Sequence, residues 1–172
     1  HVRSRRQRQM CIRDRLHGPG ELGFEQIEAA VLNVARYDVF KLAEAVLSGN
    51  LVRTQRMLDG LQAEGEAEVL VHWALAEDIR ALKRVKTALG AGRPLPMALR
   101  DNRIWGVKEK LFERALPRLS EQQVDRLVAA AQRVDGIVKG LKSPDWPLDS
   151  WQALHRLAAL VCQAVAGQRA ST

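Results

Sequence analysis

The sequence is poor in the residue types on which many structural and catalytic sites depend. It contains two cysteines, Cys11 and Cys162, and neither belongs to a CxxC pair or to a Cys/His cluster. Two isolated cysteines cannot form a disulfide framework, and their spacing argues against a structural zinc site. This cysteine usage favours a reducing compartment, so we expect a cytoplasmic protein.

Long apolar runs and nucleotide-binding motifs are also missing. The longest uninterrupted apolar run covers residues 157–162, far short of the roughly 20 residues that span a bilayer. The basic N-terminus is not followed by the apolar segment of a secretory signal. The sequence has no GxxxxGK[ST] phosphate loop, and none of its four histidines lies three or four residues from another histidine or a cysteine. We therefore expect no membrane association, no cofactor, no metal and no catalytic site in this segment.

One pair of reactive side chains was weighed against this expectation. His155 and Cys162 are seven residues apart on one expected helix, a spacing that could place them on the same face. They could form a base and a nucleophile. We interpret them instead as a buried cysteine beside an ordinary helix histidine.

Charge is abundant but unevenly distributed. Lys and Arg number 27 against 20 Asp and Glu, a net charge of +7. Residues 1–15 carry six arginines and one aspartate, residues 16–79 carry four basic and eleven acidic side chains, and residues 80–110 carry nine basic and two acidic. A basic segment is often just a solvated helix face, but this one also contains a tryptophan.

The basic N-terminal arm has an unusual origin. Residues 5–15, RRQRQMCIRDR, resemble letter for letter the translation of one frame of a common sequencing-library adapter. We interpret residues 1–15 as a disordered, adapter-derived artefact and leave them out of the fold. The alternative is a native basic tail that binds nucleic acid.

Apolar residues recur at helical spacing through the rest of the chain, and no stretch alternates like a strand. The pattern predicts an all-α bundle of seven to eight helices. The expected helices begin at Phe24, at an Asp38 cap, at an Asn50 cap, at Glu66, at Pro96, at Arg103, at a Ser120–Gln123 capping box and at an Asp149 or Ser150 cap.

The one constellation suited to binding lies in residues 100–110. Trp105 is flanked there by Arg100, Arg103, Lys108 and Lys110. An indole among cations can stack on an unpaired base while the cations hold phosphate. From these residues alone, the favoured interpretation is instead that Trp105 is a core residue. Weaker DNA-contact candidates lie in the preceding basic helix, at Arg80, Lys83, Arg84 and Lys86.

Several segments together resemble a known family. They are FKLAEAVLSG (40–49), RMLDGLQAEG (56–65), WALAEDIR (73–80), IW (104–105), ALPRLS (115–120), VDGIVKGL (134–141), WQAL (151–154) and VC (161–162). In this order and spacing they resemble the C-terminal collar region of the delta subunits of bacterial DNA polymerase III, which are clamp-loader subunits. Each segment alone is weak evidence, and only the order and spacing of all of them along the chain make the resemblance specific.

The resemblance implies a role in DNA replication. Residues 37–166 are expected to form the helical collar domain, residues 16–36 a linker and the end of the lid domain, and residues 167–172 a flexible tail. Expected partners are the gamma/tau and delta-prime subunits and primer–template DNA, with the sliding clamp reached only through N-terminal domains that this chain does not contain. The family is a component of the DNA-directed DNA polymerase, a nucleotidyltransferase holoenzyme, without ATPase activity of its own, and is cytoplasmic in bacteria.

The resemblance also favours Trp105, with Arg103 and Lys108, as residues that lie against template DNA. Two other functions remain open: a stand-alone helical nucleic-acid-binding domain, and a helical adapter outside replication.

Overall fold

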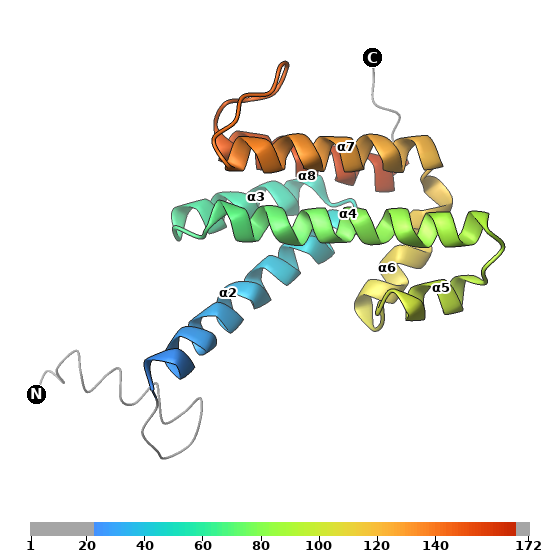
Figure 1. The fold of residues 1–172 in the computed structure, drawn as a ribbon, viewed down its shortest axis with the longest axis horizontal. Coiled ribbons are helices and arrows are strands. Elements are labelled where there is room, and N and C mark those ends of the chain that lie inside the picture. The colour runs from blue at the N-terminus through green and yellow to red at the C-terminus, as the bar shows by residue number, and fades with distance from the viewer. Residues whose placement is uncertain (1–22, 168–172) are drawn as a thin grey trace, which may run out of the picture. The chain divides into compact units, whose positions relative to one another are not determined.

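The computed structural model describes residues 23–167, and all the regular structure within them is helical (Figure 1). The elements are α2 (Phe24–Leu47), α3 (Leu51–Ala63), α4 (Glu68–Gly90), α5 (Leu95–Asp101), α6 (Val107–Ala115), the 3-10 turn η1 (Leu116–Arg118), α7 (Glu121–Val138) and α8 (Ser150–Val165). Seven α-helices in this part of the chain confirm the predicted all-α bundle. The predictions for residues 1–15, for the linker at 16–22 and for the tail at 168–172 lie outside the described residues.

Helix α2 corrects the prediction of two separate helices before residue 48. Asp38 was expected to cap a second helix, but it lies inside one continuous helix, Phe24–Leu47. No glycine or proline occurs between Phe24 and Leu47, so nothing in the local sequence breaks the backbone hydrogen bonding there. The chain divides into two compact units between Asp38 and Val39, within this helix. The apolar spacing of Phe24, Ile27, Val31 and Val34 is the basis for the first of the two expected helices, and their side chains lie outside the described ones.

Helix α4 is the central element of the unit that begins at Val39. It packs along α7 and contacts α5 and α8, while α8 also packs against α3 and α7. Figure 1 shows α7 on one side of α4 and the short α5 and α6 on the other. The core between them is mostly aliphatic, with Phe112 and Trp151 as its buried aromatic residues among the described ones, and its fully buried large side chains include Leu42, Leu58, Ile79, Leu82, Leu99, Phe112, Leu116, Leu119, Leu154 and Leu157.

Not every apolar residue of α4 belongs to this core. Val69 and Trp73 are exposed, whereas Val71 and Leu75 are buried. Among residues 23–167, no helix combines the length and the apolar character that a membrane span requires.

Three helix starts confirm the capping predictions. Asn50 accepts a hydrogen bond from the Arg53 backbone N–H at 3.0 Å, and Asp149 accepts one from Gln152 N–H at 2.8 Å. Ser120 and Gln123 form a complete capping box, with backbone-to-side-chain hydrogen bonds of 3.1 and 2.8 Å. Each contact satisfies a backbone N–H that the first helical turn would otherwise leave without a partner.

Most of the described helices end at a glycine with positive φ, and α5 ends at an arginine in the same conformation. Glycines with positive φ follow five of the helices, at Gly49, Gly65, Gly92, Gly140 and Gly167. The equivalent position after α5 is occupied by Arg103, whose φ is 56°. There the Ile104 N–H donates to the Leu99 carbonyl and the Arg103 N–H to the Arg100 carbonyl, both at 3.0 Å, which is the Schellman pattern.

This turn corrects the predicted start of the next helix. A helix was expected from Arg103, but α6 begins at Val107. Arg103 takes the left-handed conformation that ends α5, and Gly106 precedes α6 with φ 67° and ψ −133°, a conformation that is essentially restricted to glycine. Residues 102–106 are therefore a loop with two backbone reversals, and Trp105 lies between them.

Candidate nucleic-acid interface

Trp105 faces solvent. Its exposed fraction is 65%, whereas the neighbouring Ile104 is 6% exposed and packs in the core. Of the two interpretations left open by the sequence, a core Trp105 is wrong. An exposed indole beside a buried isoleucine means that the loop itself is fixed to the bundle while its aromatic ring remains available for contact.

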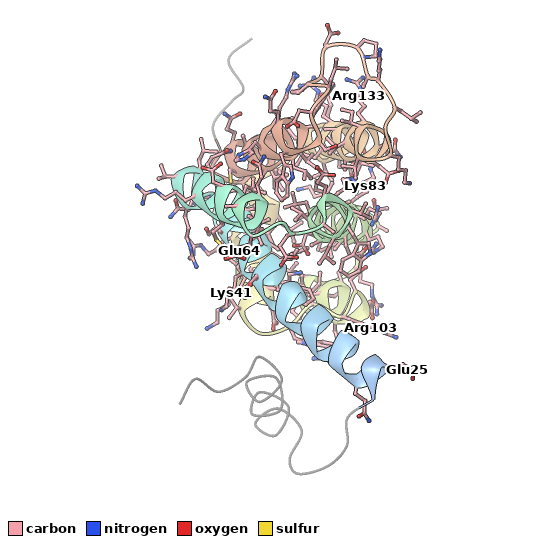
Figure 2. The ribbon with its side chains drawn as sticks, turned by 90° about the vertical axis from the view of Figure 1, so that its left-hand side faces the viewer. Glu25, Lys41, Glu64, Lys83, Arg103 and Arg133 are labelled. Atoms are coloured by element: carbon pink, nitrogen blue, oxygen red, sulfur yellow. The ribbon has the colours of Figure 1, made fainter. Side chains whose placement is uncertain are left out.

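The cations closest in sequence to Trp105 fall into two groups. The side chains of Arg100 and Arg103 are exposed, and among residues 23–167 neither guanidinium group forms a hydrogen bond or an ion pair, although the charge of Arg100 helps to lower the pKa of the neighbouring Asp101. Lys108, in contrast, donates to a carboxylate oxygen of Asp78 at 2.5 Å. The last turn of α5 and the loop that follows it thus offer an indole and two guanidinium groups without a hydrogen bond or ion pair, which is the chemistry needed to bind a base and its phosphates. Figure 2 shows Arg103 on the far side of α4 from Arg133, the side on which α5 and α6 lie.

The weaker candidates in α4 all have internal partners. Arg80 and Arg84 both bond to Glu77, at 3.3 and 2.8 Å, and Lys83 pairs with Asp125 of α7 at 2.6 Å. Lys86 donates to the Leu116 carbonyl at 2.9 Å. Much of the positive charge of residues 80–110 is therefore balanced within the fold.

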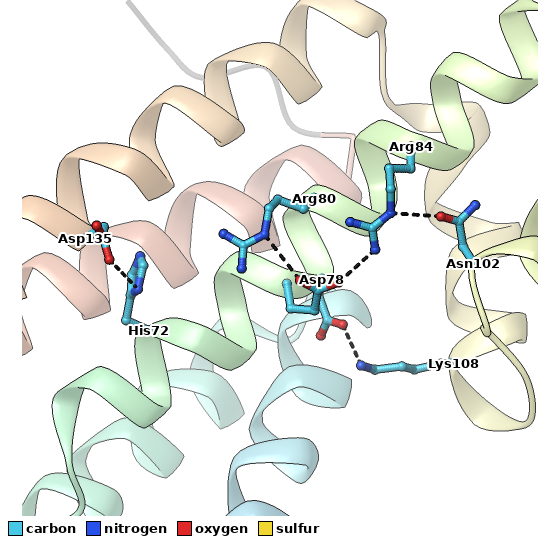
Figure 3. Close-up of polar contacts among 8 residues, drawn as sticks. His72, Asp78, Arg80, Arg84, Asn102, Lys108 and Asp135 are labelled. Atoms are coloured by element: carbon cyan, nitrogen blue, oxygen red, sulfur yellow. Dashed lines mark hydrogen bonds and ion pairs between the residues drawn. The ribbon is translucent and has the colours of Figure 1, made fainter.

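The Asp78–Lys108 pair joins α4 to the first turn of α6 (Figure 3). The Asp78 side chain is buried, 9% exposed, and its second carboxylate oxygen has no hydrogen-bond partner among the described residues. Burial raises the pKa of Asp78, and the nearby Lys108 ammonium only partly offsets that effect. Lys108 also lies over the ring of Phe40, 5.7 Å from its centroid. The lysine therefore neutralises a carboxylate that would otherwise be buried without a counter-ion.

A second contact joins α4 to the end of α5 (Figure 3). Arg84 Nε donates to the Asn102 side-chain oxygen at 2.9 Å, and the Asn102 amide donates to the Ala98 carbonyl at 2.8 Å. Burial alone would raise the pKa of Glu77, but its hydrogen bonds to Arg84 and Arg80 outweigh burial and lower it. Glu77 therefore stays ionised and orients both arginines.

Glu77, Asp78 and Asn102 were not identified from the sequence. The pairs they form join residues far apart in the chain, 30 positions for Lys108–Asp78 and 18 for Arg84–Asn102. The one available signal was an acidic pair at residues 77–78, in the middle of a helix whose other acidic residue, Glu68, lies in its first turn.

The structure separates His155 from Cys162. His155 bonds through Nδ1 to the Gln55 side chain and through Nε2 to Asp59 at 3.2 Å. Cys162 lies 3.4 Å from the Thr54 hydroxyl, and burial raises the pKa of its thiol. A thiol held in its protonated form is a poor nucleophile, so the interpretation as a buried cysteine agrees with the geometry. Across residues 23–167, no three His, Cys, Asp or Glu side chains gather where they could hold a metal ion.

The described residues thus form an all-α helical module that exposes an indole and two arginines around the loop after α5. No protein-family model matches the chain. It is similar to DNA polymerase III subunit delta of Escherichia coli (strain K12), with 27% identity over 143 residues. The match covers 83% of this chain and 40% of the relative, in its C-terminal part, so the chain spans less than half the length of that protein. The resemblance to the C-terminal region of the delta subunits is confirmed.

Proposed function

We propose that this chain is the collar part of a delta-type clamp-loader subunit in bacterial DNA replication. The observation that carries the proposal is the match to subunit delta along 83% of the chain. The all-α bundle supports it, because a collar is built from packed helices. In this proposal residues 37–166 form the collar domain and residues 16–36 the linker and the end of the lid.

The proposed partners are the gamma/tau and delta-prime subunits, with primer–template DNA as a further ligand. The sliding clamp would be contacted through the part of the subunit that this chain does not match. The segment would contribute binding, not chemistry, to a DNA-directed DNA polymerase holoenzyme in the cytoplasm. Apolar side chains exposed on the surface, such as Leu51, Val52 and Leu148, are available for contacts with neighbouring subunits.

The proposed DNA-facing element is the segment of residues 100–106, which comprises the end of α5 and the loop after it. Trp105 would stack on a base, and Arg103 and Arg100 would hold flanking phosphates. The exposed indole and the uncommitted guanidinium groups support this assignment. Lys108 and the α4 cations are weaker candidates because a phosphate would have to compete with the carboxylates and the carbonyl that they already contact.

Assembly distinguishes this proposal from a stand-alone nucleic-acid-binding domain. The chain is mixed with the gamma/tau and delta-prime subunits encoded in the same genome, and complexes are separated by size-exclusion chromatography. We expect co-elution, and weak binding to a primed template by a chain that lacks residues 1–15. If that shortened chain does not co-elute and alone binds the template tightly with a steep salt dependence, the clamp-loader proposal fails.

A further inference from the structure

Two consecutive acidic residues of α4 hold the two sides of the Trp105 loop. Glu77 orients Arg84, whose Nε donates to Asn102 at the end of α5 at 2.9 Å. Asp78 binds Lys108 in the first turn of α6 at 2.5 Å. Asn102 and Lys108 lie three residues before and three residues after Trp105. The loop is therefore attached to α4 on both sides of its exposed indole, on one side through Arg84, which Glu77 orients, and on the other directly through Asp78.

Consecutive residues suit this arrangement because of helix geometry. Neighbouring side chains on an α-helix point about 100° apart, since one turn takes 3.6 residues. Asp78 consequently lies on the buried side of α4, while Glu77 remains partly exposed beside Arg84. Asp78 can thus contact Lys108 of α6 while Glu77 contacts the partly exposed Arg84.

The loop needs such attachments. Helices α5 and α6 are short, with seven and nine residues, and helices of that length are not stable without tertiary contacts. The loop between them contains two residues with positive φ, Arg103 and Gly106. An aromatic side chain on a loop that moved freely would lose conformational entropy on binding and bind more weakly.

We propose that Arg84, Asn102 and Lys108 are positioning residues that hold Trp105 in place for stacking, rather than DNA contacts themselves. This inference rests on the proposed DNA-facing role of Trp105. It changes the assignment of Arg84 and Lys108, which the sequence grouped with the phosphate-binding cations. The carboxylates of Glu77 and Asp78 orient them, and Asn102 passes the constraint to the Ala98 carbonyl through a 2.8 Å hydrogen bond.

The variants that test this proposal separate charge from position. Asn102→Ala removes the attachment without changing charge, and Arg84→Ala removes both the attachment and one charge. Lys83→Ala is the matched control, because it removes one charge from the same helix but from a side chain that pairs with Asp125 on α7. All are made in the full chain, so residues 1–15 add the same background to each.

The first readout is hydrogen exchange of residues 99–108 without DNA. We expect faster exchange in Asn102→Ala and Arg84→Ala and wild-type exchange in Lys83→Ala. The second is affinity for a single-stranded oligonucleotide across a salt series. We expect Asn102→Ala to bind about fivefold more weakly, because one hydrogen bond that orders the loop is lost. The salt slope should not change, because the substitution removes no charge.

The opposite pattern would overturn the proposal. If Arg84 contacts phosphate, Arg84→Ala lowers the salt slope by about 0.7 and Asn102→Ala binds like wild type. Wild-type exchange of residues 99–108 in Asn102→Ala overturns it as well. Asp78→Asn tests the second attachment: a positioning role predicts weaker binding although Lys108 is released, and tighter binding contradicts it. If exchange is faster in Asn102→Ala but Trp105→Ala binds the oligonucleotide like wild type, the attachment of the loop is supported and the DNA role of Trp105 is refuted.

Discussion

Replacing Trp105 by alanine separates a binding residue from a core residue, and Trp151 provides the control. The exposed fractions of the two tryptophans are 65% and 8%, so about a third of Trp105 is buried against more than nine-tenths of Trp151. A buried aromatic side chain removes roughly 150–250 Å² from water. Trp105 therefore buries about 50–90 Å² and Trp151 about 140–230 Å².

These areas give different costs of truncation. At about 25 cal/mol per Å² they correspond to roughly 1–2 and 4–6 kcal/mol, and both are upper bounds because the unfolded chain is not fully extended. We expect Trp105→Ala to lower the free energy of unfolding by about 1 kcal/mol and Trp151→Ala by about 3–5 kcal/mol, cavity cost included. For a chain of this size these losses lower the melting temperature by about 3 °C and by about 10 °C or more.

Binding should rank the two variants in the opposite order. Loss of one stacked base costs about 1–3 kcal/mol, a roughly 5- to 150-fold weaker affinity of Trp105→Ala for a single-stranded oligonucleotide. Trp151→Ala, measured below its melting temperature, should bind like wild type. Thermal unfolding by circular dichroism and oligonucleotide binding by fluorescence anisotropy give both numbers. Equal stability losses in the two variants, or unchanged affinity in Trp105→Ala, would refute this reasoning.

Three further predictions concern the loop, its attachment and a helix cap. Arg103→Gly should keep or raise stability, by up to about 1 kcal/mol, because glycine tolerates the left-handed conformation, while oligonucleotide affinity falls with the lost cation; a loss of stability in chemical denaturation would contradict it. Lys108→Met should destabilise the chain most at neutral pH. Removing the lysine raises the pKa of Asp78 further, so the loss of stability is present where that carboxyl is ionised and fades as the pH falls through its folded-state pKa. Melting curves at pH 7 and pH 4 check this. A loss of stability that does not depend on pH would argue against the ion pair. Ser120→Ala should lower the free energy of unfolding by about 1 kcal/mol through loss of the capping box, which urea denaturation measures and an unchanged midpoint would rule out.

The parts of the fold that depend on local chemistry could be predicted from the sequence. Asn50, Ser120 and Asp149 were identified as caps, and each satisfies a backbone N–H three residues ahead. Asp38 carries a capping side chain too, yet it lies within α2. A cap residue permits a helix start but does not require one, and continuous hydrogen bonding is the more stable alternative where neither glycine nor proline intervenes.

The end of α5 could not be predicted for a related reason. The left-handed residue that closes a helix is usually glycine, and the sequence has Arg103 there. Without that signal the apolar spacing from Ile104 onward was assigned to a helix that starts four residues too early. The hydrogen bonds that impose the turn depend on Ile104 packing into the core beside Leu99, which is a tertiary effect.

The candidate site was predicted in composition but not in arrangement. Trp105, Arg103 and Arg100 were identified because an aromatic among cations is a local pattern. The internal partners of Lys108 and Arg84 were not, because Asp78 and Asn102 reach them only once α4, α5 and α6 are packed. A count of positive charges therefore overstated the cations available to DNA.

The central claim is that the segment of residues 100–106 lies against primer–template DNA in an assembled clamp loader. The most direct test is photo-crosslinking of a reconstituted complex of this chain with gamma/tau and delta-prime subunits, using a primed template with a photoreactive base at the junction. The account predicts that the crosslinked peptide of this chain contains Trp105, and that Trp105→Ala loses the crosslink while Trp73→Ala, a change at another exposed indole, keeps it. Crosslinks confined to other parts of the chain would contradict it.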